Sequence, residues 1–171
     1  MSKEPISVKK RNGRGIEPLD LDKIHVMVEE ATKGVAGVSA SQVEIQSGIQ
    51  FYDGISTEEI QEILIRSASD LIDLEHPNYQ FVAARLLLFA IRKSLYGKIR
   101  EIPHLESHII DCVSKEVYDA AIYDKYSKEE IAEANGYIDH TRDFLFTYAG
   151  LRQVADKYLV QDRSTGRVYE T

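Results

Sequence analysis

Apolar residues change their spacing along the first hundred positions of the chain. Ile6 and Val8 alternate with polar residues and are followed by Asn12-Gly13, a dipeptide typical of two-residue β-hairpin turns. From there on, apolar residues recur three or four positions apart, the spacing that forms one buried face of a helix. The pattern predicts an N-terminal β-hairpin that turns at Asn12-Gly13 and leads directly into helices.

Capping residues mark the first two helices. Asp20 and Asp22 are suited to accept backbone N–H bonds at the start of a helix that Gly34 and Gly37 are expected to end. Ser39 and Gln42 have the spacing of a capping box, in which each side chain bonds the other residue's backbone N–H. A second helix is therefore expected from residue 40. The apolar stripe of the first helix comprises Ile24, Met27, Val28, Ala31 and Val35.

A third helix is expected after a turn over residues 51–55. Ser56 and Glu59 form another capping box, and apolar residues keep a helical spacing until His76-Pro77. Proline cannot donate a helical hydrogen bond, so the helix is expected to stop there.

The fourth helix is apolar on nearly every side over residues 81–91, as expected for a helix enclosed by its neighbours, and Gly97 ends it. Residues 98–103 are polar and contain a proline, which favours a domain boundary. We therefore expect one domain over 1–97 and a second over 98–171.

The second part of the chain is also predicted to be mainly helical, with a capping box at Ser127 and Glu130. Two strands alone are only marginally stable, so the terminal hairpin is expected to pair with material absent from the sequence. The fold class is thus mainly α with small β-hairpins, the first capping a four-helix cluster. Helices are expected over 104–116, 127–138 and 141–156, and two short strands over 158–169.

Charge is distributed unevenly along the chain, whose net charge is −7. The first 15 residues carry a net charge of +4, so the remainder carries −11. An acidic body argues against a domain that binds nucleic acid duplexes, whereas the basic head fits either a compact anion such as a polyphosphate or a solvated tail. The basic residues of the head are Lys3, Lys9, Lys10, Arg11 and Arg14.

Cys112 is the single cysteine, which excludes a disulfide framework, a CxxC redox pair and a multi-cysteine zinc ribbon within this chain. His104 and His108 precede it at four-residue intervals, but one helix seldom completes a metal shell, so we expect no metal site. No apolar run approaches 18 residues and the N-terminus lacks a signal-peptide pattern, which predicts a soluble protein of the cytoplasm, without a membrane partner.

Common phosphate-binding motifs such as GxxxxGK[ST] and GxGxxG are absent from the sequence. Phosphate could instead be held by cations from separate elements, namely Lys10 and Arg11 on the hairpin, Lys23 in the first helix and Lys93 in the fourth. Lysines near helix ends also commonly just complement the helix dipole, so spacing alone leaves both interpretations open.

Several runs of residues, in order, resemble a known family. They are Val8–Gly13, Leu21–His25, Gln50–Thr57, Tyr79–Leu86, Ile91–Lys93, Ile138–Asp143 and Lys157–Arg163. The first five resemble the ATP-cone at the N-terminus of the large subunit of class I ribonucleotide reductase, and the last two resemble the helical linker that follows the cone in bacterial and phage class Ia enzymes. The resemblance covers essentially the whole chain.

This resemblance implies a site for ATP or dATP with Mg²⁺, acting as allosteric effectors. By motif, Lys10, Arg11 and Lys93 would contact phosphates, and Thr57 would complete the pocket. The base and ribose would be lined by Glu17, Pro18, Leu19, Asp20, Leu21, Asp22 and Lys23.

The resemblance also implies that the chain carries no catalytic residue. Reduction of ribonucleoside diphosphates would need the cysteine-bearing catalytic barrel of the large subunit and the radical-generating small subunit, in an oligomeric oxidoreductase of the cytoplasm, or of the host cytoplasm for a phage protein. The chain would be a truncated or split-gene regulatory part, with no nucleic acid partner.

Gln61 and Ala90 depart from the family, because several bacterial members carry histidines there that help to recognise dATP. An assembly module with a decayed nucleotide site is therefore an alternative function. A repressor that uses an ATP-cone as its sensor is excluded, because such repressors also need four cysteines for zinc.

Overall fold

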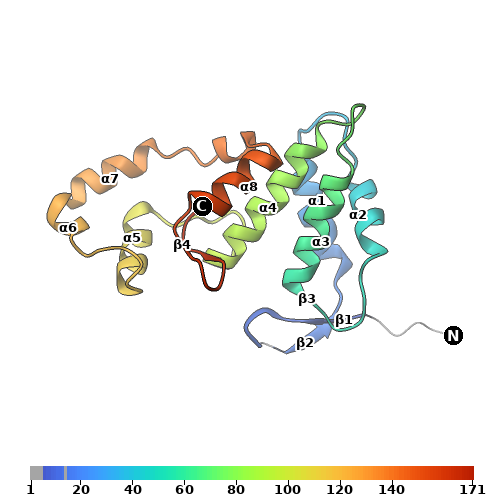
Figure 1. Ribbon diagram of the computed structural model, residues 1–171, viewed down its shortest axis with the longest axis horizontal. Helices are drawn as coiled ribbons and strands as arrows, with labels where there is room; N and C mark the ends of the chain where they lie inside the picture. The colour runs from blue at the N-terminus through green and yellow to red at the C-terminus, as the bar shows by residue number, and fades with distance from the viewer. Residues whose placement is uncertain (1–5, 14) are drawn as a thin grey trace. The chain divides into compact units, whose positions relative to one another are not determined.

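The computed structural model describes residues 6–13 and 15–171 and confirms a mainly helical chain with short strands near both ends (Figure 1). Two compact units are present. The first consists of the chain up to Ala90 together with Phe146–Arg152, and the second of Ile91–Leu145 with Gln153–Thr171. Lys3 and Arg14, two of the basic residues of the head, lie outside the described residues.

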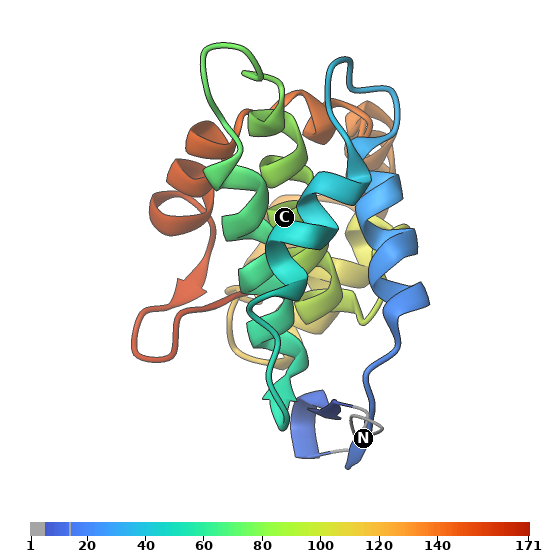
Figure 2. The same ribbon diagram turned by 90° about the vertical axis from the view of Figure 1, so that its right-hand side faces the viewer.

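The first unit contains a three-stranded sheet in the order β2-β1-β3, drawn at the lower end of the helices in Figure 2. Its strands are β1 (Ser7–Lys9), β2 (Ile16–Pro18) and β3 (Ile55–Ser56). β1 and β2 pair antiparallel with Val8 opposite Glu17, which confirms the hairpin. β3 pairs parallel to β1 with Val8 opposite Ile55, so the sequence prediction that residues 51–55 are only a turn is wrong at Ile55.

The hairpin turn is wider than the sequence predicts. The segment between β1 and β2 includes a 3₁₀ turn, η1 (Arg11–Gly13), and the backbone N–H of Lys10 donates to the carbonyl of Gly15 at 2.9 Å. Both Gly13 and Gly15 have positive φ angles, of 68° and 104°, which glycine adopts without steric cost. The two-residue turn at Asn12-Gly13 is therefore wrong, and the longer loop carries Arg11 on its 3₁₀ turn.

The predicted four helices of the first part are present, and three of them begin at the N-caps Asp20, Ser39 and Ser56. Asp20 accepts from the backbone N–H of Lys23, so Asp20 rather than Asp22 caps the first helix. Ser56 and Glu59 close a complete capping box. The helices are α1 (Leu21–Thr32), α2 (Ala40–Gly48), α3 (Thr57–Asp70) and α4 (Tyr79–Tyr96).

Two helix ends differ from the sequence prediction. α1 ends at Thr32, which leaves Val35 outside the helix. α3 ends at Asp70, well before His76-Pro77, because the carboxylate of Asp73 accepts from the backbone N–H groups of residues 75 and 76 and holds them in a turn.

The core of the first unit lies between these helices, with α2 packed against α1 and α3. Burying each aliphatic side chain contributes about 1.5–3 kcal/mol. Tyr79 is buried in α4, and its hydroxyl donates to the Gln42 side chain, so Gln42 does not complete the predicted box with Ser39. Fully buried residues include Val28, Val43, Leu64 and Val82.

The second part of the chain holds shorter elements. They are α5 (Leu105–Ser114), α6 (Ile122–Lys125), α7 (Lys128–Tyr137), η2 (Arg142–Leu145), α8 (Tyr148–Lys157), β4 (Gln161–Asp162) and β5 (Arg167–Val168). The capping box at Ser127 and Glu130 and the terminal hairpin are confirmed. The single helix predicted over 141–156 is wrong, because Thr147 accepts from the backbone N–H of Gly150 and starts a separate helix.

Within the second unit, α5 packs against α7, and a buried arginine anchors the end of α4. Arg92 is 3% exposed and its Nη2 lies 2.6 Å from Oδ2 of Asp143 in η2. None of the helices in the described part of the chain is long and apolar enough to span a membrane.

Candidate functional site

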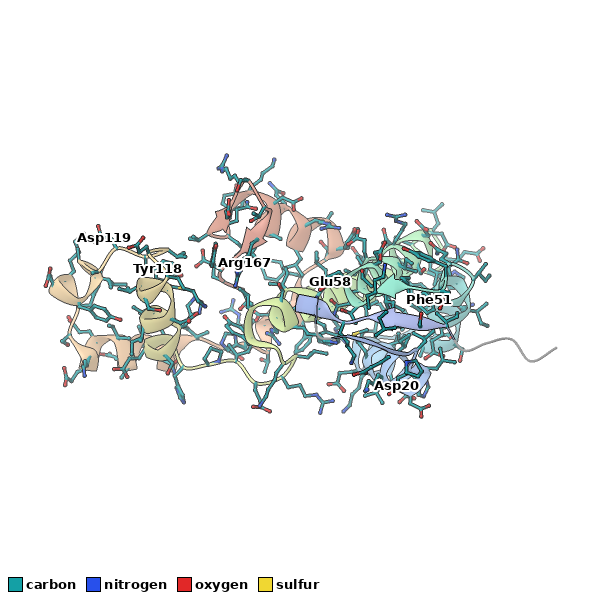
Figure 3. The ribbon with its side chains drawn as sticks, turned by 90° about the horizontal axis from the view of Figure 1, so that it is seen from below. Asp20, Phe51, Glu58, Tyr118, Asp119 and Arg167 are labelled. Carbon is teal, nitrogen blue, oxygen red and sulfur yellow. The ribbon has the colours of Figure 1, made fainter. Side chains whose placement is uncertain are left out.

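Pairing of β1 with β3 brings the basic loop beside the start of α3. Lys9 lies opposite Ser56 in the register, and Ser56 is the N-cap of α3. Arg11, two residues after Lys9, therefore reaches the first turns of α3. Glu58 in that helix and Asp20 before α1 are both labelled beside the sheet in Figure 3.

Arg11 is held by two side chains of α3. Its Nε lies 2.5 Å from Oε1 of Glu58, and its Nη2 donates to Oε1 of Gln61 at 2.8 Å. The Nη1 group of Arg11 and the Nε2 group of Gln61 are both buried and have no hydrogen-bond partner among the described residues. Since both groups are donors, the site has donors to spare for a ligand that supplies acceptor oxygens.

Thr57 lies beside the contact between Arg11 and Glu58. As the first residue of α3 it follows the N-cap directly, and its hydroxyl donates to Oε2 of Glu58 at 3.1 Å. Two of the residues expected to hold a nucleotide, Arg11 and Thr57, thus contact the same carboxylate, that of Glu58.

An open pocket of about 670 Å³ lies where β2 leads into α1. Such a volume suits a small organic ligand. Lys10 connects the pocket with the basic loop, because its Nζ lies 2.7 Å from Oε2 of Glu17. The lining consists of Glu17, Pro18, Leu19, Asp20, Leu21, Asp22 and Lys23, which is the whole segment expected to hold base and ribose.

Hydrogen bonds favour the ionised forms of Asp20 and Glu58, two carboxylates of the site. The hydrogen bond from Lys23 lowers the pKa of Asp20, and the same bond raises the pKa of Lys23. Burial acts to raise the pKa of Glu58, but hydrogen bonds from Arg11, from its own backbone and from Thr57 outweigh it and leave that pKa lowered. At neutral pH the cations therefore face negative partners, and a phosphate must compete with them.

Lys93 lies in the last turn of α4, in the second unit, and its contact with phosphate stays a prediction. Glu58 is a site neighbour that the sequence interpretation did not assign, and Gln61 entered that interpretation only as a departure from the family. The spacing offered a signal, because side chains three positions apart in a helix, such as 58 and 61, are neighbours.

Cys112, His104 and His108 of the second unit contact neighbouring side chains. His104 precedes α5 and its Nδ1 lies 3.2 Å from the amide nitrogen of Asn135, whereas His108 lies 3.5 Å from the sulfur of Cys112. Burial lowers the pKa of His108 and raises that of Cys112, which favours the neutral forms of both. Within the described ranges no three acidic, histidine or cysteine side chains are grouped to hold a metal ion.

Residues 6–94 match the family model of the ATP cone domain. That range contains every residue discussed for the loop, the pocket and the start of α3.

Curated relatives extend the similarity past the family match. The chain is 46% identical to the ribonucleoside-diphosphate reductase subunit alpha of Haemophilus influenzae over 97% of its own length and 22% of the relative's. It is 46% identical to the ribonucleoside-diphosphate reductase 1 subunit alpha of Escherichia coli, over 96% of this chain and 21% of the relative. It is 44% identical to the ribonucleoside-diphosphate reductase subunit alpha of Enterobacteria phage T4, over 79% of this chain and 18% of the relative. The chain therefore spans about a fifth of the length of the relatives that it matches.

Proposed function

Because this chain belongs to the ATP-cone family, we propose that it binds ATP and dATP as allosteric effectors and forms the regulatory N-terminal part of a ribonucleoside-diphosphate reductase large subunit. The family match implies a nucleotide effector, and the relatives are full-length reductases. The observation that carries the proposal is the pair of unpartnered buried donors where the basic loop contacts α3.

Phosphate oxygens suit the donors of the basic loop. A guanidinium presents planar donors that fit phosphate, and the lysine ammonium adds a point charge. Arg11 Nη1, Gln61 Nε2 and the Thr57 hydroxyl converge from the loop and from α3, whose N-terminus also favours negative charge. We assign the phosphates to this side, together with Lys10. The family resemblance adds Lys93 as a further phosphate-binding residue.

The pocket at the start of α1 suits the base and the sugar. Its lining combines apolar Pro18, Leu19 and Leu21 with carboxylates that can accept hydrogen bonds from an amino group or a hydroxyl. Since Lys10 bonds Glu17, the pocket and the phosphate side are continuous within the first unit.

The remaining parts of the proposal concern the larger assembly. Mg²⁺ would neutralise phosphate charge, which suits a site whose cations already face carboxylates. The partners are the rest of the large subunit and the radical-generating small subunit, in a cytoplasmic oligomer. The effector domain would comprise residues 1–97 and the linker residues 98–171. We propose no catalytic residue for this chain.

Regulation follows from linkage. A nucleotide that binds one arrangement of the large subunit more tightly than another shifts the population toward it. Inhibition by dATP requires recognition of the sugar, and the family resemblance implies that Gln61 and Ala90 stand where several bacterial members carry histidines. An assembly module with a decayed site is the second candidate, favoured by these two residues.

Calorimetric titration of the purified chain with ATP and dATP, in the presence of magnesium, tests the proposal. We expect saturable binding that Lys10→Ala and Lys93→Ala each weaken at least tenfold, since each removes a charge-assisted contact with phosphate worth about 1.5–3 kcal/mol. Lys33→Ala, which removes an exposed lysine after α1, is the matched control and should bind like the wild type. Absence of saturable binding to the wild-type chain would support the decayed module instead.

A further inference from the structure

Glu58 contacts two of the residues expected to hold phosphate. One carboxylate oxygen lies 2.5 Å from Arg11 Nε, and the other accepts from the Thr57 hydroxyl at 3.1 Å. Carboxylate and phosphate oxygens use the same donors, and both pair with arginine in the same planar geometry. The carboxylate of Glu58 therefore occupies hydrogen-bond donors of Arg11 and Thr57 that the phosphates of a nucleotide would use.

The hydrogen bond between Gln61 and Arg11 leaves more hydrogen-bond donors than acceptors at the contact of the loop with α3. Arginine can only donate, so the oxygen of the Gln61 amide must face Arg11, and its nitrogen points elsewhere. Gln61 is 6% exposed, and its nitrogen has no partner in the described part of the chain. A buried donor of this kind indicates a ligand oxygen next to Arg11, which is where Glu58 already supplies one negative charge.

We propose that Glu58 is an internal competitor for phosphate at the effector site, so that a nucleotide binds Arg11 and Thr57 only by displacing its carboxylate. The inference rests on the proposed function and adds a residue that regulates the affinity of that site. Glu58 differs from Glu17 and Asp20, which also face cations, because those two line the pocket expected to hold base and ribose.

The effect should be a gain in affinity when the charge is removed. Glu58→Gln keeps the shape of the side chain, but it removes both the repulsion of phosphate and part of the competition for Arg11. The Glu58 side chain is 49% exposed, so water screens the charge, and we expect ATP affinity to rise about three- to tenfold. The gain should shrink as salt rises from about 50 to 500 mM, because salt screens exposed charges.

Glu62→Gln provides a matched control on the same helix. Glu62 lies one turn further along α3, its side chain is 48% exposed, and its carboxylate lies 3.1 Å from Nη2 of Arg152. The control removes the same charge at the same exposure but leaves Arg11 untouched. Calorimetric titration with ATP of the wild type and both variants, with circular dichroism to check helix content, separates a local effect from a general one.

Arg11 supplies the second arm of the test. In an Arg11→Gln background, Glu58→Gln should give a much smaller gain, because the contact that it relieves is gone. The inference is overturned if Glu58→Gln binds ATP no more tightly than the wild type, or if Glu62→Gln shows an equal gain. If neither the wild type nor Glu58→Gln binds ATP, the proposed function itself fails, which is a distinguishable result.

Discussion

The ion pair between buried Arg92 and Asp143 is a contact of the second unit that we expect to be sensitive to mutation. Asp143→Asn keeps the shape of the side chain but leaves the Arg92 guanidinium without its charged partner. The Nε of Arg92 is buried and already has no hydrogen-bond partner among the described residues. The variant should therefore destabilise the end of α4, in the turn that also carries Lys93.

The expected loss of unfolding free energy follows from how deeply the two side chains are buried. Removing one partner of a fully buried pair costs about 3–5 kcal/mol, because the other charge is left uncompensated. Arg92 is 3% exposed, but the Asp143 side chain is 26% exposed, so water can partly solvate the arginine. We expect Asp143→Asn to lower the free energy of unfolding by about 2–3 kcal/mol.

Urea unfolding followed by circular dichroism measures this loss. Two units can unfold separately, so coincidence of the transitions at several wavelengths must be checked first. Asp156→Asn, an exposed aspartate of α8, is the control and should change stability by less than about 0.5 kcal/mol. A loss below about 0.5 kcal/mol for Asp143→Asn would refute the reasoning.

Three further variants test other contacts. Ser56→Ala removes the cap of α3 and should cost about 1 kcal/mol of unfolding free energy in urea, whereas an unchanged midpoint would contradict the capping argument. Hydrogen bonds from Tyr52 and Ser56 lower the pKa of Glu59 from its ordinary 4.5 to about 2, so its stabilising effect is present above pH 4.5 and is lost as pH falls toward 2. Glu59→Gln should flatten that acid limb of the stability profile, and an unaltered profile would argue against it. Tyr118→Phe removes the bond at 2.9 Å to Glu170 and should lower the thermal midpoint, since Oε2 of the half-buried Glu170 loses a donor; an equal midpoint would show that the bond contributes nothing.

Local signals in the sequence were sufficient for most helices. Ser56 and Ser127 each carry a glutamate three residues later, and both close capping boxes, because this interaction depends only on neighbouring residues. The helix break at Thr147 was missed although a hydroxyl cap was present, since the apolar spacing continued through it. β3 was missed because a two-residue strand has no periodicity and depends on its pairing with β1.

The site was predicted only in part, because some of its contacts join residues far apart in the sequence. The segment from Glu17 to Lys23 lines one pocket because its residues are consecutive. Arg11 meets Glu58 and Gln61 across 47 and 50 positions, a contact that depends on tertiary structure and on no local pattern. The family resemblance named Arg11 and Thr57, but the competing carboxylate between them became visible only in the fold.

Hydrogen exchange at saturating ATP tests the central claim most directly, because it reports where the nucleotide binds. The account predicts slower exchange at backbone amides of residues 7–11, 16–23 and 55–61, with α5 (Leu105–Ser114) unchanged as the internal control. Saturable binding with protection confined to other residues, or no protection at any ATP concentration, would contradict it.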